Sequence, residues 1–215
     1  MSLKKGLVLD LDISSEGLQG TTKFKDKTPY ENNGTFSNVT LTTDHKGKAN
    51  SAGLFNGTDS YIEVAPSTIL NQNYTGFTVS AWVKYTETQP GTNSFGYIFH
   101  KNNAQYVGIA PFVLYIEGTQ VRWQIYNGSI NVSITSDSSI YNDGVWHNLV
   151  GLYNGTQIIL YIDGIAINST AVTSFANNDG YLSIGSTRYN PTYRPFKGSI
   201  ERPQIWNRAL SADEV

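Results

Sequence analysis

Hydrophobic and polar residues alternate one by one along several stretches of the chain. Residues 77–85 read FTVSAWVKY, with Phe, Val, Ala, Val and Tyr at every second position. The same alternation recurs in residues 121–126, 130–135 and 157–162. Because successive side chains of a β-strand point to opposite faces, each stretch predicts a strand with one face in a hydrophobic core.

Turn signals separate these stretches. Asn-Gly or Asp-Gly pairs occur at 56–57, 127–128, 143–144, 154–155, 163–164 and 179–180. Such pairs supply the positive φ angles that tight hairpins need. The pairs at 154–155 and 163–164 each stand between two strand patterns, so residues 146–168 are predicted to form consecutive hairpins. With many short strands and no sustained helical period, the prediction is an all-β, two-sheet antiparallel sandwich.

One helical signal lies at the end of the chain. Ser211 and Glu214 have the Ser-x-x-Glu spacing of a capping box, in which each residue hydrogen-bonds the backbone amide of the other. The sequence stops one residue later, so we expect either one short C-terminal helical turn or a domain cut from a longer chain. A length of 215 residues suits a single domain spanning 1–215.

Composition and charge exclude several classes of function. Only 15% of the residues are charged and the net charge is -2, so the surface is made polar mainly by uncharged side chains. This balance offers no positive field for nucleic acid or anionic membranes. The absence of Cys excludes disulfides and Cys-ligated metals. No apolar stretch approaches the roughly 20 residues that span a bilayer, and residues 1–10 lack a signal-peptide core.

Six segments then resemble one known family in the right order. Residues 143–150 (DGVWHNLV), followed by residues 160–164 (LYIDG), resemble the W-H-x-hydrophobic and L-Y-x-D-G hairpin of laminin-G-like domains. Similar matches are residues 54–64 (LFNGTDSYIEV), 77–84 (FTVSAWVK), 181–185 (YLSIG), 196–201 (FKGSIE) and 205–211 (IWNRALS). The resemblance covers nearly the whole chain and implies a concanavalin A-like jelly roll, the fold of lectins and glucanases. That fold serves carbohydrate binding, adhesion and, in some branches, glycoside hydrolysis.

The acidic residues argue against an enzyme. Glycoside hydrolysis uses two carboxyl groups that flank one bond, and the hydrolases of this fold carry them as alternate acids on one strand. The chain has no Glu-x-Asp or Glu-x-Glu, and its one alternating pair is Asp10 and Asp12, which also suit a solvent-facing or ion-binding role. None of the three His stands near a nucleophile motif. We therefore predict a non-catalytic domain.

A calcium site is implied by the resemblance. Residues 26–35 resemble the D-x-S-G-x-x-N-x-G loop of laminin-G-like domains, which implies Asp26, Asn33 and Glu201 as oxygen ligands of a structural calcium ion. Two departures are Pro29 in place of Gly and Glu201 in place of the more common Asp. The residues also allow a simpler interpretation, in which Asp26 makes an Asx-turn and Asn33 begins a hairpin.

Ligand recognition is suggested by the side chains opposite the aliphatic core. Aromatic plates beside planar amide and guanidinium groups are suited to sugar rings, which stack through C–H faces and hydrogen-bond through hydroxyls. The predicted ligand-binding residues are Trp82, His100, Tyr106, Arg122, Gln124, Tyr126 and Tyr161. The alternative is that long loops cover one sheet, so that Trp82 and Tyr161 pack beneath them.

Eight N-x-S/T sequons occur, beginning at Asn33, Asn38, Asn56, Asn73, Asn127, Asn131, Asn154 and Asn168. They suggest either a glycosylated outer-surface protein or a chain whose turns favour Asn-Gly-Thr.

The sequence leads to three hypotheses of function. The first is a carbohydrate- or cell-surface-binding module with a structural calcium site and a glycan or cell-surface ligand. The second is a structural or adhesive component of a virion, tail fibre or surface fibre, with a homo-oligomer formed through exposed strand edges. A glycoside hydrolase comes last. We expect an extracellular, cell-surface or virion-surface location.

Overall fold

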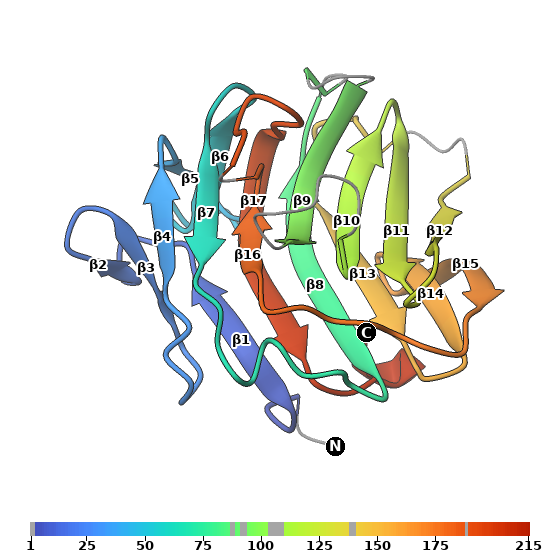
Figure 1. Cartoon of the computed structure of the whole chain (residues 1–215). Helices are drawn as coiled ribbons and strands as arrows, with labels where there is room; N and C mark the ends of the chain where they lie inside the picture. The colour runs from blue at the N-terminus through green and yellow to red at the C-terminus, as the bar shows by residue number, and fades with distance from the viewer. Residues whose placement is uncertain (1–2, 87–88, 91–93, 103–109, 138–140, 188) are drawn as a thin grey trace.

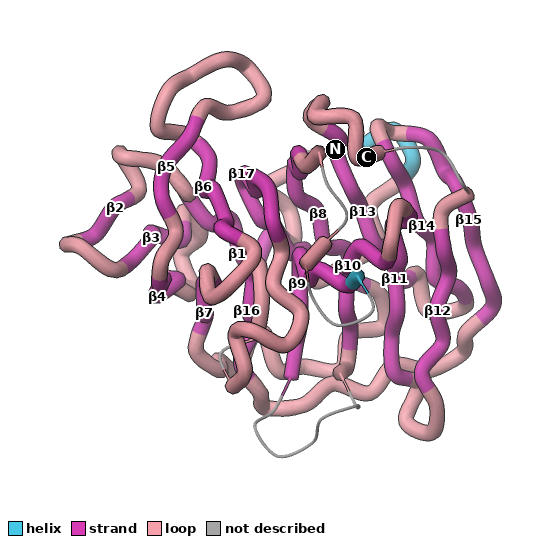
Figure 2. Tube along the Cα trace, turned by 90° about the horizontal axis from the view of Figure 1, so that it is seen from above, coloured by secondary structure: helices cyan, strands magenta, loops and turns pink. Residues whose placement is uncertain are grey.

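The computed structural model describes residues 3–86, 89–90, 94–102, 110–137, 141–187 and 189–215. Two layers of antiparallel strands face each other, and Figure 2 shows both layers from above. The predicted two-sheet antiparallel sandwich is confirmed. None of the helices in the described ranges is long and apolar enough to cross a membrane.

The layer that we call sheet 1 is built around the longest strand. Its order is β5 (Thr40–Thr42), β6 (Ala52–Asn56), β17 (Lys197–Trp206), β8 (Phe77–Lys84), β13 (His147–Tyr153), β14 (Gln157–Ile162) and β15 (Ile165–Ala171). The strand β1 (Leu7–Asp12) pairs with the second half of β17, beside the part that pairs with β6.

The opposite layer, sheet 2, contains the remaining strands. Its order is β2 (Leu18–Gln19), β3 (Lys23–Asp26), β4 (Gly34–Ser37), β7 (Tyr61–Val64), β16 (Tyr181–Ile184), β9 (Phe95–Asn102), β10 (Phe112–Glu117), β11 (Gln120–Tyr126) and β12 (Asn131–Thr135). The pairing of Leu11 in β1 with Asp26 in β3 joins the two sheets (Figure 1).

The hydrophobic core lies between the sheets, where the alternating patterns place it. Every second residue of β11 is buried, and Trp123 is 0% exposed. Its Nε1 donates to the carbonyl of Leu152 across the core at 3.2 Å. Gly151 makes room for this ring, because a Cβ atom at that position would lie 2.4 Å from the indole.

Both predicted hairpins are present, with Asn154-Gly155 joining β13 to β14 and Asp163-Gly164 joining β14 to β15. The C-terminal turn is also confirmed as a single 3-10 turn at Ala212–Glu214, where the Glu214 carboxylate accepts the Ser211 amide at 3.0 Å.

Three of the sequons form Asx-turns. The Oδ1 atoms of Asn56, Asn127 and Asn154 each accept backbone amides two and three residues ahead. The glycine that follows each of them has a positive φ angle. Turn geometry therefore gives these Asn-Gly pairs a structural role, while their glycosylation stays a prediction.

Two irregularities interrupt the alternation of side chains. In β9 the register against β10 shifts, so Tyr97 and His100 stack on the same face with ring centroids 4.4 Å apart. In β17 the register shifts between Glu201 and Gln204, and Arg202 adopts a φ of 48°. Such bulges redirect side chains. As a result, Tyr97 and His100 lie on one face of β9, and Glu201 and Gln204 lie on one face of β17, although each pair is three positions apart in the sequence.

Candidate ligand-binding groove on sheet 1

A groove of about 770 Å³ lies on the outer face of sheet 1, between the sheet and the two ends of the chain. Figure 2 shows both termini on this side of the sandwich. Strands β8, β13 and β17 form the floor with Ser80, Trp82, Asn148, Val150, Gln204 and Trp206, and the walls include Leu3, Lys4, Lys27, Thr28, Pro29, Arg202, Leu210, Glu214 and Val215.

Trp82 is the half-buried aromatic residue of this floor. The His45 ring, from the loop between β5 and β6, stacks on the indole with centroids 4.1 Å apart and planes 7° apart. The Glu201 carboxylate fixes the imidazole, with 2.7 Å between His45 Nδ1 and Glu201 Oε2, and accepts the His45 amide at 2.9 Å. The indole is thus held in one orientation.

Polar side chains lie on the floor beside the indole. Asn148 donates through Nδ2 to the Ser80 hydroxyl at 3.3 Å. Gln204 donates through Nε2 to Asp10 Oδ1 at 3.0 Å. Each amide uses one N–H of its NH₂ group in these contacts, and its carbonyl oxygen can accept a hydrogen bond from a ligand hydroxyl.

Three cations in or beside the groove, Lys27, Arg202 and Arg208, are paired with carboxylates. Lys27 lies 2.9 Å from Asp12, and Arg202 lies 3.3 Å from Asp10. Arg208 binds both carboxylate oxygens of Glu214, at 2.7 and 2.8 Å. These hydrogen bonds from Arg208, together with the Ser211 amide, lower the pKa of Glu214 to about 2.

The predicted ligand-binding residues do not lie on one surface. Trp82 and Tyr161 are on the outer face of sheet 1, where Tyr161 is buried in a second hydrophobic cluster with Val150, Leu152, Trp206 and Leu210. His100, Arg122, Gln124 and Tyr126 lie on the outer face of sheet 2, opposite to the core-facing residues of β9 and β11. Tyr106 lies outside the described residues.

The residues predicted to bind calcium do not fit that ion. Both oxygens of Asp26, which is 1% exposed, accept hydrogen bonds from the Asp10, Thr28 and Asn32 amides and the Thr28 hydroxyl, at 2.6 to 3.0 Å. Asn33 Oδ1 accepts the Asp26 amide at 2.8 Å. Glu201 is engaged with His45. The described residues contain no group of three or more His, Cys, Asp or Glu side chains that could hold a metal ion.

Asp26 therefore makes the local turn that the simpler interpretation describes, with donors where calcium would need free oxygens. Calcium binding itself stays a prediction, without support from the arrangement of these side chains.

His147 has a structural role in its hairpin. Its Nδ1 lies 2.7 Å from Asp163 Oδ2 and its Nε2 lies 3.3 Å from Asp143 Oδ1. Asp163 also accepts the Asn148 amide at 2.8 Å. These contacts join the W-H segment at the start of β13 to the D-G turn that follows β14.

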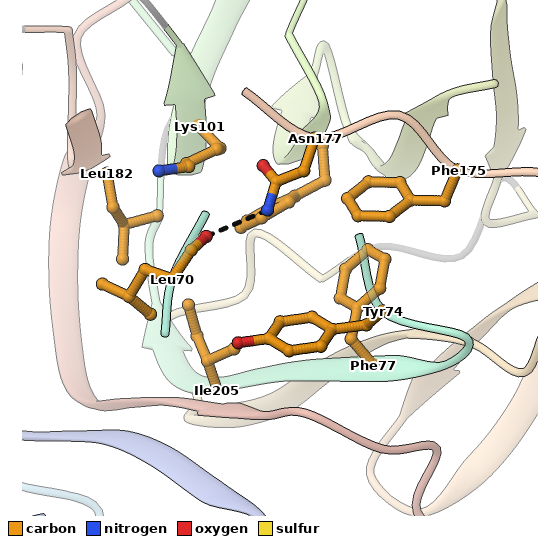
Figure 3. A pocket seen from close by; sticks show the side chains of 9 residues that line it. Leu70, Tyr74, Phe77, Lys101, Phe175, Asn177, Leu182 and Ile205 are labelled. Carbon is orange, nitrogen blue, oxygen red and sulfur yellow. Dashed lines mark hydrogen bonds between the residues drawn. The ribbon is translucent and has the colours of Figure 1, made fainter. Parts of the chain in front are cut away.

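A second cavity, inside the core, is too small for a ligand. It has a volume of about 10 Å³, which is about the space for one water molecule. Figure 3 shows Lys101, Asn177 and Tyr74 around it. Lys101 donates to Asn71 Oδ1 and to the Gly180 carbonyl, and burial lowers the pKa of Lys101 to about 8.

Several side chains in and around the groove were not found by the sequence analysis. His45 reaches Trp82 from a loop far away in the sequence, and no local pattern indicates that contact. Gln204 and Arg202 depend on the bulge in β17, for which Pro203 in the middle of a strand was the available signal.

Comparisons with known proteins agree with this fold. The binding domain of Paraclostridial Mosquitocidal Protein 1 matches with a TM-score of 0.75 and 16% identity, over 97% of this chain and 50% of that chain. The receptor binding domain of botulinum neurotoxin D matches with a TM-score of 0.74 and 17% identity, over 99% of this chain and 52% of that chain.

A third structure is the ligand binding domain of botulinum neurotoxin serotype D in complex with N-acetylneuraminic acid. It has a TM-score of 0.73 and 16% identity, over 97% of this chain and 49% of that chain. The chain thus spans about half the length of these domains. A comparison with curated protein sequences found no match.

The family model for laminin G-like domains of the concanavalin A-like lectin/glucanases superfamily matches residues 56–215. Because this match covers more than half of the chain, the protein belongs to the concanavalin A-like lectin/glucanases superfamily.

Proposed function

We propose that the chain is a non-catalytic carbohydrate-binding module that holds a glycan in the groove on sheet 1. The observation that carries this proposal is the Trp82 indole, which His45 and Glu201 fix in the floor of a 770 Å³ groove. A fixed aromatic plate beside amide groups suits the C–H face and the hydroxyls of a sugar.

The ligand of this groove is proposed to be uncharged. Lys27, Arg202 and Arg208 each have a carboxylate partner within 3.3 Å. A charged ligand would have to compete with these ion pairs, whereas the hydroxyls of a neutral sugar need only the uncharged side chains of the floor, Ser80, Asn148 and Gln204.

The same ion pairs argue against hydrolysis. A general acid at neutral pH needs a raised pKa, but the pKa of Glu214 is lowered to about 2 by Arg208. Asp10, the other carboxylate of the lining, is engaged with Arg202 and Gln204. Neither carboxyl group is suited to protonate a glycosidic oxygen.

The structural neighbours support recognition at a cell surface. Two of them are named as binding or receptor binding domains of toxins, and one holds N-acetylneuraminic acid. By analogy we propose a glycan or cell-surface ligand for this chain and a location outside the cell or on its surface.

The second candidate function, an adhesive or fibre component, is favoured by one observation. Strands β12 and β15 end their sheets at the same side of the sandwich (Figure 1), and neither NVSIT nor IAINSTA contains a charge or a proline. Uncharged edge strands are templates for pairing with another chain. Light scattering measures whether the chain forms such an oligomer. Ser169→Lys places a charge on β15 and is expected to dissociate the oligomer. A wild-type protein that is monomeric at all concentrations would contradict the adhesive or fibre function.

A screen of neutral glycans on an array tests the main proposal. We expect the wild type to bind a subset of them and Trp82→Ala to lose at least tenfold in affinity, because truncating a central aromatic anchor of a binding site costs about 2 kcal/mol or more. Trp146→Ala is the matched control, since this half-buried tryptophan does not line the groove. Equal binding by a folded Trp82→Ala variant, or no neutral glycan bound by the wild type, would contradict the proposal.

A further inference from the structure

One arginine on the opposite face of the sandwich differs in its surroundings from the arginines of the groove. Arg194 lies in the segment between β16 and β17, and its carbonyl accepts the amide of Tyr97 in β9 at 3.2 Å. This hydrogen bond fixes the backbone of Arg194 against the outer face of sheet 2. The groove on sheet 1 lies on the other side of the core.

Aromatic side chains surround the Arg194 guanidinium. Its carbon lies 4.2 Å from the Phe95 ring centroid, 4.8 Å from that of Tyr193 and 5.4 Å from that of Tyr97. Two terminal N–H groups donate to the hydroxyls of Tyr97 at 2.7 Å and Tyr193 at 3.2 Å. The rings in turn pack on one another, with Phe95 stacked on Tyr115 at 5.4 Å. The guanidinium is therefore held in one place.

Arg194 has no carboxylate partner among the described residues. The other arginines of the described ranges each have one, Arg122 with Glu117, Arg202 with Asp10 and Arg208 with Glu214. A half-buried charge usually has a counter-ion, because burial without one is costly. The positive charge also acts on its neighbourhood: burial and, secondly, Arg194 lower the pKa of His100 to about 3.

The donor capacity of the guanidinium is only partly used. Arginine has five N–H donors in a planar fork that matches a carboxylate. Two donors reach the tyrosine hydroxyls, and the Nε–H is buried without an acceptor. Two terminal N–H groups remain without an acceptor among the described residues, and the side chain as a whole is half-buried.

We propose that Arg194 and its aromatic neighbours Tyr97, Tyr193 and Phe95 form a second binding site, which takes the carboxylate of an acidic sugar. The guanidinium binds the carboxylate through terminal N–H groups, and the tyrosine hydroxyls and ring edges contact the sugar ring. This site is separate from the groove on sheet 1 and does not depend on the neutral-glycan proposal.

Titration calorimetry with defined probes tests the site. The probes are the methyl glycosides of N-acetylneuraminic acid and of glucuronic acid, each compared with its methyl ester, which lacks the charge. We expect at least one acid to bind the wild type, and its ester to bind at least tenfold more weakly, because hydrogen bonds to a charged partner are the stronger ones. This comparison uses only the wild-type protein, so folding of a variant cannot confuse it.

Variants then locate the binding. The Arg194→Gln variant is expected to bind the acid at least tenfold more weakly than the wild type, and to bind the ester with the same affinity as the wild type. Lys23→Gln is the control on the same sheet, because it removes the charge of an exposed side chain in β3 that is not enclosed by aromatic rings. Trp82→Ala is expected to retain acid binding while losing neutral glycans, which separates this site from the groove. Binding of neither acid, equal binding of acid and ester, or unchanged binding by Arg194→Gln would overturn the proposal.

Discussion

At the scale of single residues, Asp26 shows that a residue can match a family motif without having the metal-binding arrangement that the motif suggests. The family-like loop suggests a metal ligand, yet each carboxylate oxygen of Asp26 accepts two hydrogen bonds from the protein. Those bonds tie the end of β3 to β1 and to the loop that follows. The sequence motif singles out Asp26 as a residue with a role in this loop. The structure is needed to show that this role is to accept hydrogen bonds from backbone amides.

We predict that Asp26→Ala strongly destabilises the protein, with or without calcium. The substitution leaves three buried amides without an acceptor, so the free energy of unfolding should fall by about 3 kcal/mol or more. Asp44→Ala is the control, because Asp44 also accepts two amides but in an exposed turn where water can replace it. Thermal unfolding with calcium and with chelator measures both. A calcium-dependent stabilisation that Asp26→Ala abolishes would instead establish a metal site.

The buried His100 gives a second prediction, which concerns how the stability of the fold depends on pH. Burial first, and the Arg194 charge second, lower the pKa of His100 from 6.5 to about 3. Between these values the unfolded chain binds a proton that the folded chain does not, so stability is complete above pH 6.5 and falls as the pH drops towards 3. The loss is on the order of 4 kcal/mol. In His100→Phe this part of the pH dependence should vanish, and denaturant unfolding across pH 3 to 7 would show it; parallel curves would refute it.

At the scale of elements, the loop between β5 and β6 supports the floor of the groove through His45. It carries His45 onto Trp82 and satisfies the Glu201 carboxylate of β17. This contact joins segments that are 156 residues apart in sequence. Loop and strand therefore depend on each other for the geometry of the proposed binding floor.

His45→Ala is predicted to destabilise the protein by about 2 kcal/mol, since it removes a ring stack and leaves a nearly buried carboxylate without its histidine partner. This corresponds to a drop of a few degrees in the melting temperature. Lys46→Ala, an exposed change in the same loop, should have no measurable effect. If both variants melt with the wild type, His45 does not anchor the loop.

The strands themselves could be predicted because their signal is local. The alternation in β8 and β11 and the Asn-Gly turn after β13 depend on neighbouring residues alone. The bulge in β9 could not be predicted, because an extra residue changes which face a side chain occupies without changing the composition of the strand. For the bulge in β17, Pro203 was the one signal in the sequence. The stacked pair Tyr97 and His100 is a consequence of one such bulge.

At the scale of the whole molecule, the two outer faces differ in chemistry. The groove on sheet 1 has paired charges, whereas sheet 2 carries the aromatic-enclosed Arg194. Sequence reasoning selected side chains opposite the core on each strand, which was correct for Trp82 and Arg122. It could not assign them to the two faces, because strand alternation does not say which sheet a strand joins.

The most direct test of the central claim is the position at which a neutral glycan binds. In a ¹⁵N-labelled protein the four tryptophans give separate indole N–H signals, and a glycan that binds the wild type can be titrated against them. We predict that the Trp82 signal shifts with a saturable dependence on glycan, while the signal of Trp123, which is 0% exposed in the core, stays in place. A bound glycan that leaves the Trp82 signal unmoved would contradict the account.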